Sequence, residues 1–172
     1  MPFNWYALRS KSRKEDVVWR EVLSRGYEVY YPRLRVNPVN PRSRKLVPYF
    51  PGYLFVRVDL EQVGHSAFQW MPHTLGLVSF GGEPAVVPDH LVHALSQRIA
   101  EINAAGGETF DGLKQGDLVR ISDGPFRGYE AIFDTRLPGS ERVRVLLEFL
   151  GNRRQVSVIL DARQIERMKS KR

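Results

Sequence analysis

One stretch decides the fold: Tyr49-Phe-Pro-Gly-Tyr-Leu-Phe-Val-Arg-Val58. Its Pro-Gly is a turn signal, and the β-branched and aromatic residues that follow favour a strand. Because side chains alternate along a strand, Leu54, Val56 and Val58 lie on one face, and Tyr53 and Phe55 lie on the other. The aliphatic face can be buried against helices. The stretch therefore predicts a sheet whose second, aromatic face must be covered by something else.

A strand, a helix and another strand are expected before this stretch. Residues 4–9 alternate like a strand. Ser12 and Glu15 have the Ser-x-x-Glu spacing of a capping box, which starts a helix, and Gly26 stands where a left-handed residue ends one. Residues 27–32 form the second expected strand. A basic, proline-containing loop or hairpin tip over 38–48 then leads to the third.

The chain after the third strand alternates again between helix and strand. Asp59 is expected to cap a short helix over 60–71, and residues 75–80 form a fourth strand. A last helix begins at Val87-Pro88-Asp89 and carries an apolar row at helical spacing. This order predicts an α+β domain over residues 1–102, with an antiparallel four-stranded sheet flanked by helices. Residues 103–113 lack periodicity and predict a flexible linker.

Residues 114–172 have the pattern of a second, smaller domain. Candidate strands at 118–121, 129–133, 143–147, 155–159 and 164–166 are separated by turn residues, which predicts a small five-stranded β-barrel. Within this domain the segments 146–150 and 163–168 would also tolerate helix. The period-two valines at 143, 145, 156 and 158 favour the barrel.

Composition and charge exclude several classes of protein. The net charge is +7, made of +8 over residues 1–58, −6 over 59–111 and +5 over 112–172, which suits contact between part of the surface and a polyanion. Absence of cysteine rules out disulfides and thiolate metal sites. The sequence has no run of 18 apolar residues, so no membrane span is predicted. The N-terminus lacks the pattern of a signal peptide, and we expect a cytoplasmic monomer. His90 and His93 lack a third ligand, and no nucleophile has a base, so neither metal, cofactor nor enzyme activity is expected.

Two separated motifs resemble one family. Trp5-Tyr6-Ala7, residues 51–56, Phe80-Gly81-Gly82 and Val87-Pro88 resemble the N-terminal (NGN) domain of the NusG transcription factors. Residues 116–121 and 124–128 look like the KOW module that follows it in that family. Together they span nearly the whole chain. KOW barrels also occur in ribosomal proteins, so a ribosome-associated RNA-binding protein is the alternative from another class.

The segments 124–133 and 82–88 look closer to the specialised RfaH-type paralogues of this family. That resemblance implies an elongation factor that binds RNA polymerase across the DNA channel, suppresses pausing and termination, and recruits a partner through the KOW domain. The general NusG factor, which supports pausing and Rho-dependent termination, is the closer alternative. In RfaH-type proteins the C-terminal domain can instead be a helical hairpin that covers the polymerase-binding patch until it is released.

The resemblance also implies which residues meet the polymerase. Tyr6, Tyr53 and Phe55 match the patch that docks on the clamp helices of the largest subunit. His65 and Ser66 are similar to the segment that touches the gate loop of the second-largest subunit. The plain alternative for the aromatic residues is that they are core residues under a helix.

The remaining implied contacts are with DNA and with a second partner. Lys11, Arg13, Lys14 and Arg20 surround the first helix and would face upstream or non-template DNA, mainly through phosphates, unless they are simply a solvated surface. His73-Thr74 could approach an extruded base. In the barrel, Tyr129 and Leu150 match positions that contact ribosomal protein S10 or, less readily, Rho.

Overall fold

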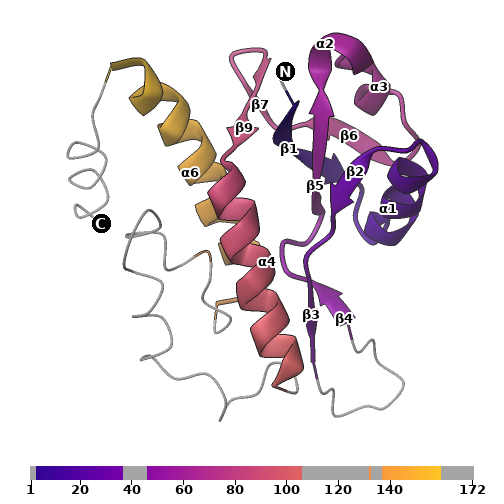
Figure 1. The fold of residues 1–172 in the computed structure, drawn as a ribbon, viewed down its shortest axis with the longest axis vertical. Coiled ribbons are helices and arrows are strands. Elements are labelled where there is room, and N and C mark those ends of the chain that lie inside the picture. Colours follow the sequence, from indigo (N-terminus) through magenta and orange to yellow (C-terminus); the bar gives the residue numbers. More distant parts are fainter. Residues whose placement is uncertain (1–2, 37–45, 106–131, 133–136, 160–172) are drawn as a thin grey trace.

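The computed structural model of the protein describes residues 3–36, 46–105, 132 and 137–159. Its centre is an antiparallel sheet with the strand order β2-β5-β1-β6, and a further short strand, β9, also pairs with β1 (Figure 1). The strands are β1 (Phe3–Ser10), β2 (Glu28–Tyr30), β5 (Tyr53–Asp59), β6 (Thr74–Leu77) and β9 (Val86–Val87). The predicted α+β class and antiparallel sheet are confirmed.

The two faces of the sheet belong to two different hydrophobic clusters. In the β1–β5 register, Leu8 pairs with Leu54 and Tyr6 pairs with Val56, and these four side chains lie in the cluster beneath α1 (Glu15–Ser24) and α3 (Ser66–Gln69). Phe55 lies in the opposite cluster, together with α4 (Asp89–Ala104) and α6 (Gly139–Ile159). The predicted division of the central strand into an aliphatic and an aromatic face is therefore confirmed.

Helix α1 ends as predicted but begins differently. Gly26 has φ +83° and donates its N–H to the carbonyl of Leu23, while the Tyr27 N–H reaches Val22, which is a Schellman C-cap. The predicted capping box is wrong, because the helix begins after Lys14 without a side-chain cap. Glu15 is buried, and its carboxylate instead accepts the N–H of Gly52 at 2.7 Å.

Short elements connect the main ones. Asp59 accepts the N–H of Glu61 and so caps α2 (Leu60–Val63), which with α3 replaces the single short helix expected there. Two hairpins flank the sheet: β3 (Arg33–Arg35) with β4 (Leu46–Pro48), and β7 (Ser79–Phe80) with β8 (Glu83–Pro84). In α4 the buried residues are those of the apolar row: Leu91, Val92, Leu95, Ile99 and Ile102.

The C-terminal region departs from the predicted barrel. Residues 143–147 and 155–159 were expected to be strands, and both lie in the helix α6. Val145, Leu146, Phe149 and Leu150 recur at helical spacing and are buried against the aromatic face of the sheet. Burial on a long apolar surface outweighs the modest strand preference of valine, which depends strongly on context. The five-stranded barrel is thus not confirmed.

The predicted domain limits are only partly covered by the described residues. Helix α4 continues to Ala104, slightly beyond the expected limit at 102. Residues 106–113 of the predicted linker and the candidate strands at 118–121 and 164–166 lie outside the described residues, and of 129–133 only Ile132 is described.

The Glu15–Gly52 bond yields a stability prediction. Glu15→Ala should lower the free energy of unfolding by about 1–3 kcal/mol, because the half-buried Gly52 N–H loses a charged acceptor. The control is Glu21→Ala, whose exposed ion pair with Arg25 should be worth less than about 1 kcal/mol. Urea denaturation of both variants measures the difference, and equal midpoints would contradict this role for Glu15.

Candidate functional site

Five aromatic side chains of the sheet and its loops form one continuous surface, here called the aromatic face: Tyr49, Phe50, Tyr53, Phe55 and Phe80. Tyr49 and Phe50 meet edge to face with ring centroids 5.0 Å apart, and Phe50 and Phe55 do so at 5.9 Å. Edge-to-face rings at these separations attract one another beyond simple burial. Direct ring contacts therefore hold Tyr49, Phe50 and Phe55 together within the face.

Helix α6 lies on the aromatic face beside α4 (Figure 1). Two glycines allow this close approach. A Cβ atom at Gly139 would lie 2.7 Å from the ring of Pro51, and one at Gly151 would lie 3.2 Å from the ring of Phe80. Phe50 and Phe55 are consequently inaccessible to solvent. The helix thus covers the aromatic face.

Arg142 holds the first turn of α6 against the sheet. Although charged, it is only 5% exposed. Its Nε donates a hydrogen bond to the carbonyl of Tyr49 at 3.0 Å, and a terminal nitrogen donates to the carbonyl of Leu137. Its guanidinium carbon also lies 4.2 Å from the centroid of the Tyr49 ring, within the range of a cation–π contact. Arg142 therefore ties the helix to the loop that opens β5.

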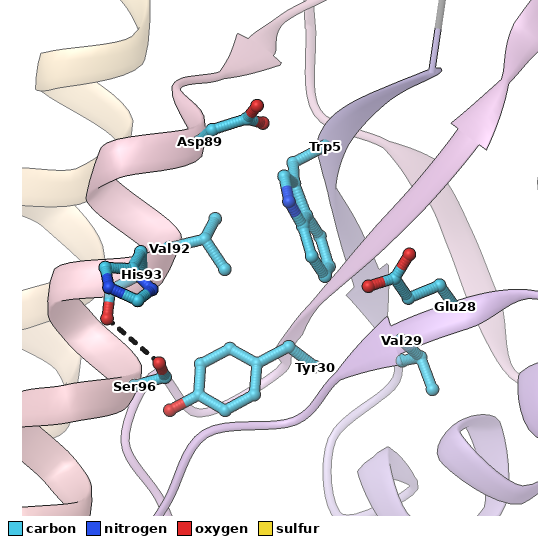
Figure 2. Close-up of a pocket in the computed structure, with 8 residues that line it drawn as sticks. All are labelled: Trp5, Glu28, Val29, Tyr30, Asp89, Val92, His93 and Ser96. Atoms are coloured by element: carbon cyan, nitrogen blue, oxygen red, sulfur yellow. Dashed lines mark hydrogen bonds between the residues drawn. The ribbon is translucent and has the colours of Figure 1, made fainter.

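A cavity of about 420 Å³ opens between α4 and the strands β1 and β2. Figure 2 shows Trp5 and Tyr30 from the strands facing Val92 from α4, with the carboxylates of Glu28 and Asp89 nearby. Tyr30 stacks on Phe55 at 6.4 Å, so the cavity adjoins the aromatic face. Burial raises the pKa of the Tyr30 phenol, although the positive charge of Arg33 acts to lower it. The raised pKa keeps the phenol protonated.

The predicted docking residues do not lie together. Tyr53 and Phe55 belong to the aromatic face, with Phe55 buried and Tyr53 half-buried. Tyr6 points to the opposite face and is buried there among the side chains beneath α1. His65 and Ser66 are exposed where α3 begins, at the edge of that second cluster. Adjacent residues on a strand point to opposite faces, so only every second side chain of β1 can reach the aromatic face.

The predicted DNA-contacting residues are better grouped. Lys11, Arg13 and Lys14 immediately precede α1 and Arg20 lies in its middle; all four are exposed and are here called the basic edge. The N–H of Lys11 donates to the carbonyl of His73 at 2.9 Å, which brings the His73 turn beside it. Thr74 is buried.

The Thr74 hydroxyl donates to the carbonyls of Phe68 and Met71, so Thr74 closes the turn and its side chain does not face solvent. A cavity of about 260 Å³, lined by Arg9, Ser12 and Tyr53 among others, lies between the basic edge and the aromatic face.

The predicted C-terminal contact residues have different positions. Leu150 is buried on α6 against the aromatic face, and Tyr129 lies outside the described residues. Among the described residues no group of three His, Asp or Glu side chains could hold a metal ion. No described helix is long and apolar enough to span a membrane.

Several residues of the site were missed from the sequence. Tyr49, Phe50 and Phe80 could have been found, since Tyr49 and Phe50 directly precede the third predicted strand and Phe80 ends the fourth. The role of Arg142 had no sequence signal, because it depends on α6 lying against Tyr49. Trp70, which is 78% exposed, lies within the helix expected over 60–71, and no pattern in the sequence marks it as exposed.

The domain that carries the aromatic face and the basic edge matches a known family model. The model, described as "Transcription termination factor nusG", matches residues 3–96, more than half of the chain. This places the protein among transcription termination and antitermination factors. The chain belongs to the NusG family.

Similar proteins extend the match over the whole chain. A relative in Buchnera aphidicola is 25% identical over 95% of this chain and 95% of its own length. One in Deinococcus radiodurans is 26% identical over 96% and 99%, and one in Pseudomonas aeruginosa is 25% identical over 98% and 100%. All three are described as the transcription termination/antitermination protein NusG. A solved structure titled "Domain interaction in Thermotoga maritima NusG" aligns with 59% of each chain at 25% identity and a TM-score of 0.44.

The Arg142 contacts predict how firmly α6 is held. Arg142→Ala should speed hydrogen exchange at the α6 amides 145–150 by roughly 5- to 150-fold, corresponding to the loss of about 1–3 kcal/mol. Arg144→Ala is the matched control, because Arg144 is exposed and pairs only with Glu141 and Glu148 of its own helix in the described contacts. Unchanged exchange in Arg142→Ala would show that Arg142 does not secure the helix.

Proposed function

We propose that the protein is an elongation factor that binds RNA polymerase across its DNA channel and suppresses pausing and termination. One observation carries this proposal: a NusG-family domain bears a pre-formed aromatic face that accepts a helix. In this proposal the clamp helices of the largest polymerase subunit dock on Tyr53 and Phe55. Aromatic side chains in apolar grooves are where interface binding energy concentrates.

The helix that now occupies the face supports a regulated form of this function. Helix α6 and the clamp helices would compete for the same side chains, so the polymerase binds only molecules in which α6 has left. Such competition reduces the apparent affinity for the polymerase, because the intrinsic affinity is multiplied by the fraction of molecules in which α6 has left the face. A covered face is what the resemblance to RfaH-type proteins implies, and it supports a specialised factor over the general one.

The basic edge would act beside the docked face. Lys11, Arg13, Lys14 and Arg20 are exposed and clustered, as contacts to the phosphates of upstream or non-template DNA require. His65 and Ser66 are exposed at the start of α3 and would meet the gate loop of the second-largest subunit. Bridging the clamp and the gate loop would hold the polymerase closed around DNA in the cytoplasmic nucleoid.

Release of α6 would also make the C-terminal domain available. Leu150 is buried in the covered arrangement and becomes accessible only when α6 leaves the sheet. We propose that residues 114–172 then form the KOW barrel and recruit ribosomal protein S10 or, less readily, Rho. Recruitment would therefore follow polymerase binding, and the tether would raise the local concentration of the partner.

Transcription through a known pause with the cognate polymerase tests the docking. Tyr53→Ala should require roughly tenfold or more protein for the same run-through, because a half-buried interface aromatic is lost. Gly139→Leu should require less protein than the wild type, because the added side chain clashes with Pro51 and loosens α6. Val17→Ala, an exposed apolar residue of α1, is the neutral control.

Some results would count against the proposal. Equal run-through for wild type and Tyr53→Ala, with unchanged denaturation midpoints, would remove the docking claim. Replacement of the general factor in a Rho-dependent termination assay would favour the general role instead. Co-purification with ribosomes but without polymerase would favour the RNA-binding alternative.

A further inference from the structure

The cavity between α4 and the strands β1 and β2 takes no part in the proposed polymerase and DNA contacts. Its volume of about 420 Å³ lies within the range of small-molecule sites, which is about 300–1,000 Å³. Its walls come from β1, β2 and α4, and no described residue of α6 lines it. The cavity is therefore formed while α6 covers the aromatic face.

Two aromatic rings on the strands form one wall of this cavity. Trp5 of β1 and Tyr30 of β2 are both half-buried, and the buried Val92 of α4 faces them (Figure 2). The Tyr30 ring stacks on Phe55 with the ring centroids 6.4 Å apart, which holds it in place. The face of an aromatic ring is electrostatically negative and attracts a nearby cation. The cavity therefore suits a ligand that has a positive charge and an apolar portion.

Two carboxylates stand at the same cavity. Glu28 lies on β2 and Asp89 is the first residue of α4, and Figure 2 shows both carboxylates turned toward the Trp5 indole. Asp89 forms no ion pair with another described residue. Glu28 pairs with Arg57 at 3.2 Å, but the two side chains are 58% and 38% exposed, and such surface pairs are weak. Negative charge beside aromatic rings favours a cation and disfavours an anion.

The chemistry of these walls suits a guanidinium group better than other cations. Among the described residues no group of three His, Asp or Glu side chains could hold a metal ion. An ammonium group is strongly hydrated, whereas a guanidinium group is planar, more weakly hydrated and stacks on aromatic faces. The chain already contains such an arrangement elsewhere. The guanidinium carbon of Arg33 lies 4.6 Å from the ring centroid of Trp19 and 4.9 Å from that of Tyr31.

We propose that this cavity binds a guanidinium group. The group stacks against the rings of Trp5 and Tyr30, and its N–H donors pair with the carboxylate of Asp89, while Glu28 adds negative charge. The alkyl stem of the ligand lies on Val92. An arginine side chain of a partner protein and a free alkylguanidine both supply this chemistry. Because the site lies outside the aromatic face and the basic edge, the inference does not depend on the proposed polymerase or DNA contacts.

Heteronuclear NMR titration of the full-length protein tests the inference. The probes are an acetylated and amidated Gly-Arg-Gly peptide, the same peptide with neutral citrulline in place of arginine, and ethylguanidinium chloride, all at constant ionic strength. The indole N–H of Trp5 and the backbone amides of His93 and Ser96 should shift with both guanidinium probes. The citrulline peptide should bind roughly fivefold more weakly or worse, because it loses the cation–π attraction and a charge-assisted hydrogen bond.

Variants locate the binding in the cavity. Asp89→Asn should weaken binding of the arginine peptide by roughly 2- to 12-fold, through loss of a charge-assisted hydrogen bond. Trp5→Leu, which keeps an apolar side chain but removes the ring, should weaken it by roughly 2- to 30-fold. Glu101→Gln is the matched control, because it removes the same charge from an exposed site near the other end of α4, and it should bind as the wild type does. Denaturation midpoints confirm that each variant is folded.

Each outcome decides for or against the site. Tighter binding of the arginine peptide than of ethylguanidinium supports the site and assigns it to a partner's arginine side chain. Equal affinity supports the site and assigns it to a free alkylguanidine. The inference is wrong if the citrulline peptide binds equally well, or if Asp89→Asn and Glu101→Gln have the same affinity. It is also wrong if neither guanidinium probe shifts these signals at up to about 50 mM, well above the millimolar constant expected of so small a ligand.

Discussion

Burial of the aromatic face is the constraint on which the rest of the structure depends. Phe50 and Phe55 cannot be turned into the other core, because β5 already gives that face to Leu54 and Val56. Full burial of one such side chain is worth about 1.5–3 kcal/mol, so leaving the face uncovered is costly. In the described structure α6 is that cover. Any partner that docks there must replace contacts that α6 already makes.

This constraint links residues that are far apart in the chain. Gly139 and Gly151 let α6 approach Pro51 and Phe80, and Arg142 ties it to the loop before β5. At the end of β1 beside that loop, the turn that leads into β6 is held to Lys11 through the His73 carbonyl. The proposed polymerase contact and the proposed DNA contact therefore share one rigid sheet. Displacement of α6 can expose the aromatic face without disturbing the basic edge.

Much of this arrangement was predictable from local pattern, and the errors have physical causes. The alternation from Leu54 to Val58, the buried row of α4 and the left-handed Gly26 depend on neighbouring residues, so the sequence shows them. Helix α6 could not be predicted this way, because its valines favour a strand until an apolar surface is available to bury them. Tyr6 was placed with Phe55 by resemblance, whereas the register of β1 turns it to the other face.

The central claim is that α6 must leave the aromatic face before the polymerase can bind. The chain has no cysteine, and Pro51 touches the Cβ position of Gly139, so cysteines at these two sites should come within the Cβ separation of a disulfide, about 3.5–4.5 Å. Run-through at a pause should be absent for the oxidised Pro51→Cys/Gly139→Cys protein and should be restored by a reducing agent. The control is Gly139→Cys alone, whose run-through should be the same under oxidising and reducing conditions. Equal run-through in the cross-linked and reduced forms would contradict the claim.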